Sequence, residues 1–100
     1  MKAIFKHAII AEAPAETLIK IEGAWYFPPK YLQWQYFEEN SFLTAPTWQG
    51  EANYYNVVVD GEVDELAAWY YPIPKKTAIE RVGSNFANYV SFRGDVKIIE

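Results

Sequence analysis

The most constraining feature of this sequence is a run of strand-forming residues that ends at an Asp-Gly turn signal. Residues 53–60 include two tyrosines and three consecutive valines, and Gly61 follows them. Glycine reaches positive φ without steric cost, so Asp60-Gly61 between apolar runs predicts a β-hairpin. The returning strand is expected at residues 66–71, before two prolines that would interrupt a sheet. A continuous apolar strand is typical of burial on both faces, and it directs the chain toward a β-rich fold.

The rest of the chain predicts further strands and one short helix. Expected strands are an opening pair or one bent strand at 2–11, then 17–22, 25–27, an irregular strand at 42–50, and a closing hairpin of 89–92 with 96–99. The acidic stretch 38–41 is expected to be a loop. Residues 75–82 are expected to be helical, because their apolar side chains share one face and Gly83 follows. The sequence therefore predicts a mainly β, mostly antiparallel fold with one short helix near residues 75–82.

Length and composition limit the classes of protein that fit. One hundred residues, 51% of them hydrophobic and 18% aromatic, are expected to form a single domain over residues 1–100. A net charge of -4 without a basic stripe argues against nucleic acid as a partner. The chain has no cysteine, charges at positions 2 and 6 leave no apolar signal core, and no apolar run approaches the roughly 20 residues of a membrane span. A cytoplasmic protein without a membrane partner is expected.

Candidate metal-binding and catalytic residues are few. His7 is the only histidine, and without cysteine it cannot build a usual structural zinc site. Residues 60–65 include four carboxylates, but Glu65 stands where a calcium loop of the EF-hand type requires glycine. No phosphate-binding glycine loop and no nucleophile motif occurs. We expect no metal and no cofactor, and the sequence favours a protein without catalytic activity.

An aromatic-dense stretch in the middle of the chain is the best candidate for a site. Its members would become neighbours if the strands at 53–60 and 66–71 pair; they are Trp48, Tyr54, Tyr55, Trp69, Tyr70 and Tyr71. Alternation along each strand would put Tyr54 and Tyr55 on opposite faces, and likewise Trp69 and Tyr70. One interpretation is packing in the core and on the sheet surface. The other is the wall of a ligand pocket, because amphipathic rings offer a large contact area with little loss of entropy. The sequence leaves both interpretations open.

Several segments of the chain resemble one known family. They are Glu22-Gly23 with Tyr26 to Pro29, Trp48 to Tyr55, Val57 to Gly61, Ala67 to Pro74, and Tyr89 to Phe92. In this order they are similar to the family known as domain of unknown function 427, and the Ala-Ala-Trp-x-Tyr-Pro-x-Pro piece is the most specific part. The resemblance implies a small β-barrel-like domain with one short helix and no established activity. The family is also catalogued as nucleotidyltransferase-like.

The chain departs from the pattern of that family at four polar positions. The pattern has a cysteine, a lysine, an arginine and a histidine where this chain has Pro46, Gln49, Trp34 and Asn88. A lysine at position 49 would offer a point charge for an anion, and the neutral Gln49 side chain does not. The chain is therefore expected to bind phosphate-bearing ligands poorly. With the family positions included, the candidate ligand-binding residues are Tyr26, Trp48, Gln49, Tyr55, Trp69 and Tyr71.

Three functions are open on these observations. The leading hypothesis is a non-catalytic small-ligand or partner-binding module with an aromatic-lined pocket. The first alternative is an enzyme that handles nucleotides or another phosphorylated substrate. The second is a homo-oligomeric interaction protein, such as a homodimer, with exposed aromatic side chains in the interface.

Overall fold

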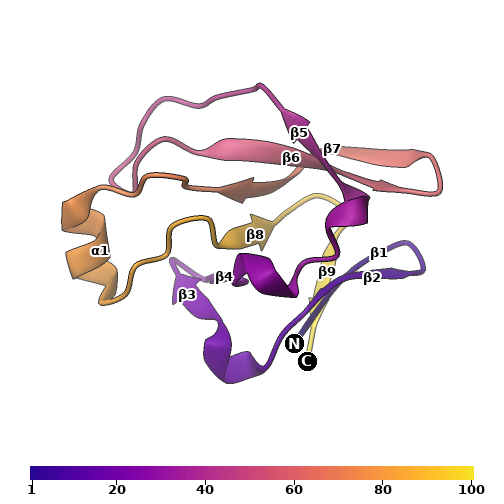
Figure 1. The fold of residues 1–100 in the computed structure, drawn as a ribbon, viewed down its shortest axis with the longest axis horizontal. Helices are drawn as coiled ribbons and strands as arrows, with labels where there is room; N and C mark the ends of the chain where they lie inside the picture. The colour runs from indigo at the N-terminus through magenta and orange to yellow at the C-terminus, as the bar shows by residue number, and fades with distance from the viewer.

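A computed structural model describes residues 1–100 as three antiparallel sheets with one α-helix (Figure 1). The largest sheet has the strand order β5-β6-β7-β8 and forms the upper and middle part of the molecule in Figure 1. Its strands are β5 (Phe37–Asn40), β6 (Asn53–Val59), β7 (Glu62–Tyr70) and β8 (Val90–Phe92). The predicted mainly β architecture is confirmed.

The predicted hairpin is the centre of the large sheet. Asp60 and Gly61 both have left-handed backbone angles, with φ of 50° and 78°. Two such residues form the turn type whose twist matches that of the flanking strands. The turn pairs Val59 with Glu62, so β7 begins at Glu62 and is longer than the predicted segment 66–71.

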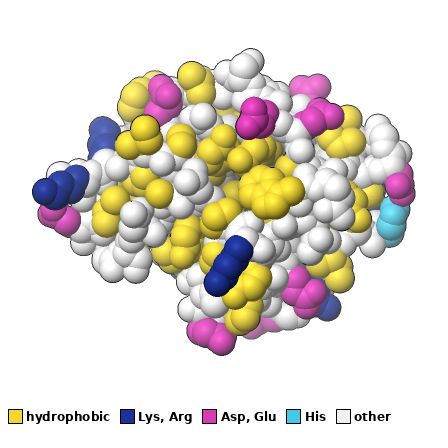
Figure 2. Space-filling view, viewed as in Figure 1, with side chains coloured by type: hydrophobic (Ala, Val, Ile, Leu, Met, Phe, Trp, Pro, Cys, Tyr) yellow, Lys and Arg dark blue, Asp and Glu magenta, His cyan; other side chains and the backbone are white.

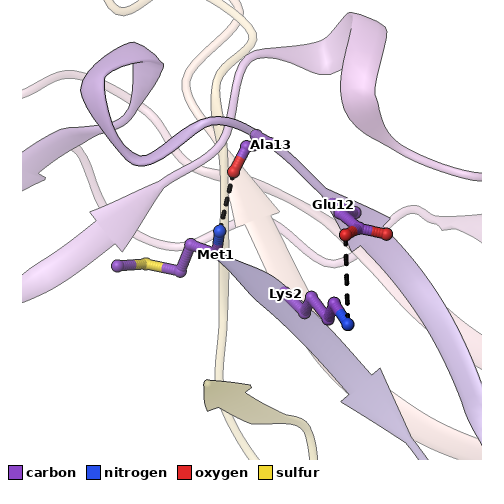
Figure 3. A network of polar contacts seen from close by, with 4 residues as sticks. All are labelled: Met1, Lys2, Glu12 and Ala13. Atoms are coloured by element: carbon purple, nitrogen blue, oxygen red, sulfur yellow. Dashed lines mark hydrogen bonds and ion pairs between the residues drawn. The ribbon is translucent and has the colours of Figure 1, made fainter. Parts of the chain in front are cut away.

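Two smaller sheets lie below the large one in Figure 1. The first has the order β2-β1-β9 and consists of β1 (Lys2–Phe5), β2 (Ala8–Glu12) and β9 (Lys97–Ile99). The second consists of β3 (Ile19–Ile21) and β4 (Ala24–Tyr26). The chain start is held beside the end of β2, because the Met1 amino group donates to the Ala13 carbonyl oxygen at 2.8 Å (Figure 3). Lys2 and Glu12 lie 4.0 Å apart across the same two strands.

The sheets do not close into a barrel, so the barrel-like description implied by the family resemblance needs correction. Two isolated bridges connect elements outside the named strand pairs, Ala11 with Leu32 and Phe27 with Val90. At the second bridge the Phe27 nitrogen donates to the Val90 oxygen at 2.8 Å, and the Val90 nitrogen donates back at 2.9 Å. This contact joins the end of β4 to β8, while the three sheets stay separate.

The predicted closing hairpin is wrong, because β8 pairs with β7 and β9 pairs with β1. The loop between them is bonded to β7 instead of turning back on itself. The Arg93 nitrogen donates to the Ala67 oxygen at 2.8 Å, and the Asp95 nitrogen donates to Asp64 Oδ2 at 2.8 Å. These bonds direct the following residues, which form β9, to the sheet that contains β1 and β2.

Two local predictions around β5 are also wrong. The stretch 38–41, predicted as a loop, contributes three residues to β5, because Phe37 to Asn40 pair with Val57 to Tyr54. The predicted strand at 42–50 has no regular secondary structure. Its middle contains Pro46, which cannot donate to a strand ladder.

The predicted helix is confirmed as α1 (Lys76–Val82), and it ends at Gly83, which has φ of 88°. A left-handed glycine at this position is a common helix terminator. Three short 3₁₀ turns complete the secondary structure at Ala15–Thr17, Pro29–Tyr31 and Trp34–Tyr36. None of the helices has the length and apolar character that crossing a membrane requires.

Buried residues form two clusters. The first has 15 buried residues, among them Phe5, Ile10, Phe27 and Val57, and comes from β1, β2, β6, β7, β8 and the loops beside them. The second has 6 buried residues and lies beside α1; they are Ile21, Tyr26, Ala52, Tyr71, Ala78 and Phe86. We call this second cluster the aromatic core, because half of its buried residues carry rings.

Candidate functional site

Five of the six sequence-predicted site residues come together at the aromatic core. Tyr26 and Tyr71 are part of it, Trp48 and Trp69 pack against it, and Gln49 lies next to Trp48 in the chain. Tyr26 and Trp69 are in edge-to-face contact, with ring centroids 6.1 Å apart. Tyr26, Tyr71 and Gln49 are 2%, 6% and 7% exposed, so these side chains fill the interior.

Gln49 belongs to a hydrogen-bonded group of side chains that joins two segments of the chain, at Glu22 and at residues 47–49. Its Nε2 donates to Glu22 Oε1 at 3.1 Å, and its Oε1 accepts a hydrogen bond from Thr47 at 2.6 Å. The same Glu22 oxygen accepts from Trp48 Nε1 at 2.5 Å. A lysine at position 49 would meet the Glu22 carboxylate before any external anion, so the structure does not present this position as an open anion site.

The backbone at Gln49 and Gly50 packs closely against the segment that precedes α1. Gly50 has φ of 131°, a region that other residues rarely adopt. A Cβ placed on it would lie 3.1 Å from the Ile73 carbonyl oxygen. The backbone carbonyl oxygen of Gln49 also accepts a hydrogen bond from the backbone nitrogen of Lys75 at 2.9 Å, just before α1. Gln49 and Gly50 therefore join the irregular segment before β6 to the start of the helix.

Tyr26 is the most buried phenol of the group. Its hydroxyl oxygen accepts a hydrogen bond from Trp69 Nε1 at 3.1 Å. Burial raises the pKa of Tyr26 far above its ordinary value, and the nearby Tyr71 and Glu22 raise it further, although the Trp69 bond acts in the opposite direction. The phenol is therefore neutral at physiological pH and serves as an acceptor for Trp69.

Replacing Tyr26 by phenylalanine should lower the free energy of unfolding by about 1–2 kcal/mol, because Trp69 Nε1 would lose its acceptor in a partly buried place. Urea unfolding monitored by tryptophan fluorescence measures the change. The double variant with Trp69→Phe removes both partners and completes a double-mutant cycle. Strictly additive effects of the two substitutions would contradict a coupling through this bond.

Tyr55, the sixth predicted residue, lies away from the aromatic core. It packs against the larger cluster, with its ring stacked on Tyr70 at 4.6 Å and edge-on to Trp34 at 5.4 Å. The cause is strand alternation, because Tyr54 points toward the aromatic core and its neighbour Tyr55 must point to the other side of the sheet. The structure therefore divides the predicted aromatic site into two groups.

The surface has two hollows, and neither is lined by the predicted residues. One, of about 410 Å³, is formed by β1 and the loop before β9 and is lined by Ile4, Phe5, Lys6, Gly94, Asp95 and Lys97. The other, of about 500 Å³, lies where β5 ends and β6 begins. We call it the Asn53 hollow, and it is lined by Glu39, Asn40, Ser41, Leu43, Asn53, Tyr54 and Tyr70.

Asn53 distinguishes this second hollow. Its Oδ1 atom is buried and has no hydrogen-bond partner. Most buried polar atoms in proteins are paired, because an unpaired one costs about 1–3 kcal/mol. Asn56, three residues further along β6, shows the usual arrangement: its Oδ1 accepts from Asn40 Nδ2 at 3.0 Å and from the Leu66 nitrogen at 3.1 Å. Asn53 is thus an unused hydrogen-bonding group at a surface hollow.

Sequence reasoning did not identify Asn53 or Glu39 as site residues, and it placed Tyr54 and Tyr70 in the aromatic-dense stretch without including them among the six candidates. The available signal was two polar asparagines inside an otherwise apolar and aromatic strand, which ordinary strand composition disfavours. One of them, Asn56, is explained by its two hydrogen bonds. The other is left without a structural reason.

His7 has a partner that involves no metal site. Its Nε2 lies 3.0 Å from Asp60 Oδ2, so the pair joins the β1–β2 turn to the β6–β7 turn on the outside of the molecule. The histidine side chain is visible at the right-hand end of Figure 2, next to an acidic side chain. No three His, Asp or Glu side chains come together in a way that could hold a metal ion.

Together these features describe a small antiparallel β domain with a filled aromatic core and a polar hollow at the edge of its largest sheet. A family model described as a domain of unknown function (DUF427) matches residues 1–99. The chain therefore belongs to that family, and the resemblance seen in its sequence is confirmed. None of the curated proteins compared with it matches.

Proposed function

We propose that this protein is a non-catalytic module that binds a small ligand in the Asn53 hollow. The unpaired Asn53 Oδ1 atom is the observation that carries the proposal. A buried acceptor without a partner lowers stability, and such costs are retained in proteins where function needs the group. The oxygen is buried in the structure, so binding in the hollow requires the carboxamide to rotate by about half a turn before a ligand donor reaches it.

The lining of the hollow supports binding of a small molecule. Tyr54 and Tyr70, which belong to opposite faces of the sheet, and Leu43 supply apolar contact, and Asn53 with Ser41 supplies polar groups that fix orientation. This combination of apolar walls with a few placed polar groups is typical of ligand sites, and about 500 Å³ lies within their usual range. Glu39 is the only acidic residue of the lining and has no histidine or lysine beside it, so the hollow offers binding groups without an acid–base pair.

The aromatic core supports the proposal indirectly. Tyr26, Tyr71 and Gln49 fill the space beside α1, and the hydrogen bonds of Gln49 and Trp48 end on Glu22. These residues would then serve as the rigid support of the domain, and the ligand would contact Tyr54, whose ring packs against that core. A chain without cysteine also fits a cytoplasmic setting, which we include in the proposal.

The test compares two asparagines of the same strand. Asn53→Leu should leave the free energy of unfolding unchanged or raise it by up to about 1 kcal/mol, because no hydrogen bond is lost and an unpaired oxygen is removed. The same variant should lose ligand binding. Asn56→Leu is the matched control, and it should lower stability by about 1–3 kcal/mol, because Asn40 Nδ2 and the Leu66 nitrogen would lose their acceptor.

Stability is measured by urea unfolding, and binding by backbone amide shifts in a screen of small polar aromatic compounds. The expected result is a set of compounds that shift the amides of residues 39–43, 53 and 54 in the natural protein and fail to do so in Asn53→Leu. Two results would overturn the proposal: a screen without shifts at these amides, or an Asn53→Leu protein that is destabilised as much as Asn56→Leu.

A further inference from the structure

The distribution of charge along the chain is strongly uneven around the Asn53 hollow. Residues 31–74, which include β5, β6 and β7, contain no lysine, arginine or histidine. The same segment contains seven acidic residues: Glu38, Glu39, Glu51, Asp60, Glu62, Asp64 and Glu65. In Figure 2 acidic side chains, and no lysine or arginine, are visible along the upper edge over β5, β6 and β7. The hollow therefore opens in a region of negative potential.

The lining itself carries one charge, and that charge is negative. Glu39 is the only ionisable group among the lining residues apart from the two tyrosines. It has no ion-pair partner within the protein, because the three ion pairs in the structure involve Glu12, Glu62 and Asp60. The carboxylate is therefore free to bind an external cation.

The other groups of the lining favour the same kind of ligand. The negative face of an aromatic ring attracts a cation, and Tyr54 and Tyr70 both line the hollow. Asn53 adds an unpaired oxygen, which needs a hydrogen-bond donor. The Asn40 amide does not compete for the ligand, because its Nδ2 donates to Asn56 and its Oδ1 accepts from the Phe42 nitrogen. Glu39, Asn53 and Tyr70 lie on one face of the sheet, because Glu39 is opposite Tyr55 and Asn53 is opposite Tyr70. A carboxylate, an aromatic ring and an amide oxygen on that face together fit an ammonium or guanidinium group.

From these contacts we infer that the Asn53 hollow is selective for a small organic cation, a molecule with a primary ammonium or guanidinium group beside an apolar part. The inference rests on the proposed function and names its ligand class. The Glu39 carboxylate pairs with the charge, the Asn53 oxygen accepts one of its hydrogens, and Tyr54, Tyr70 and Leu43 contact the apolar part. A phosphate or carboxylate ligand would instead meet Glu39 with a like charge.

The experiment uses three probes that share a phenylethyl part and differ in charge. They are 2-phenylethylammonium, neutral 2-phenylethanol and anionic 3-phenylpropanoate, each titrated into the protein of residues 1–100 while the amide shifts of residues 39–43, 53 and 54 are followed. We expect the ammonium to bind about tenfold more tightly than the alcohol, which is the combined size of one partly exposed ion pair and one cation–π contact. The carboxylate should bind more weakly than the alcohol.

Two variants test whether the preference for the ammonium depends on the Glu39 carboxylate. Glu39→Gln keeps the shape of the side chain and should reduce the preference for the ammonium over the alcohol to about threefold, the share of the cation–π contact that remains. Glu38→Gln removes the same charge from the neighbouring position of β5, whose side chain points to the other face of the strand and does not line the hollow. Glu38→Gln should therefore keep the preference.

The possible failures are distinguishable. Binding of the alcohol as tight as that of the ammonium in the natural protein would overturn the cation inference while supporting a ligand site in the hollow. Equal losses in Glu39→Gln and Glu38→Gln would also overturn it, since a general field rather than the Glu39 contact would then be responsible. Absence of shifts with all three probes would count against both the inference and the proposed function.

Discussion

Replacing Phe86 by alanine is expected to lower the free energy of unfolding by about 3–5 kcal/mol, the range for deleting a buried phenylalanine ring. Phe86 is 0% exposed and lies in the segment between α1 and β8. Its ring is edge-on to Tyr71 with centroids 5.9 Å apart, and it lies 6.5 Å from the ring of Tyr26. The aromatic core has only 6 buried residues, so few neighbours can move to fill the cavity.

Urea unfolding followed by circular dichroism measures the loss. Ile73→Ala is the control, because it removes apolar atoms from a side chain that is 84% exposed and should change stability by less than about 0.5 kcal/mol. Hydrogen exchange adds a spatial readout: the amides of α1 should lose protection before those of β6 and β7. Similar losses in the two variants would contradict the role assigned to Phe86.

The parts of the fold that depend on neighbouring residues could be predicted from the sequence. The β6–β7 hairpin follows from Asp60-Gly61, whose left-handed angles almost no other dipeptide adopts so readily. The end of α1 follows from Gly83 in the same way. In each case the decisive preference belongs to one or two residues, so no knowledge of the rest of the chain was needed.

The pairing of distant strands could not be predicted, because its causes are far apart in sequence. The turn at 93–95 looks like a hairpin turn, but the Asp95 nitrogen bonds to Asp64, 31 residues earlier. Gly94 allows this approach: a Cβ there would lie 2.7 Å from Asp64 Oδ2. Nothing in residues 89–99 alone indicates that Asp64 is nearby.

The candidate site shows the same division between local and distant causes. Strand alternation separates Tyr54 from Tyr55 and Trp69 from Tyr70, and this separation was visible in the sequence. The different roles of Asn53 and Asn56 were not visible. Asn56 is paired because Leu66, with φ of 56°, turns its nitrogen toward it at an irregular point of the β6–β7 register. An unpaired Asn53 emerges only once that register is known.

Stability should also fall steeply in alkaline solution, and Tyr26 is the main reason. A tyrosine in the unfolded chain ionises with a pKa of about 10. Burial in the aromatic core holds the pKa of Tyr26 far above that value in the folded protein. Between these two pKa values the unfolded chain releases a proton that the folded protein keeps, so rising pH favours unfolding. The stabilisation is complete below pH 10 and is lost as the pH rises toward the folded pKa.

The expected slope for Tyr26 alone is about 1.4 kcal/mol per pH unit above pH 10, which amounts to nearly 3 kcal/mol by pH 12. Tyr55 steepens it, because burial and the adjacent Tyr70 and Glu39 also raise the pKa of Tyr55. Urea unfolding at intervals from pH 8 to pH 12 measures the curve. Tyr26→Phe should be less stable at pH 8, through the lost Trp69 bond, and should have a slope shallower by about 1.4 kcal/mol per pH unit. Parallel curves for the two proteins would show that Tyr26 ionises as readily in the folded protein as in the unfolded chain, and the close packing assigned to the aromatic core would be wrong.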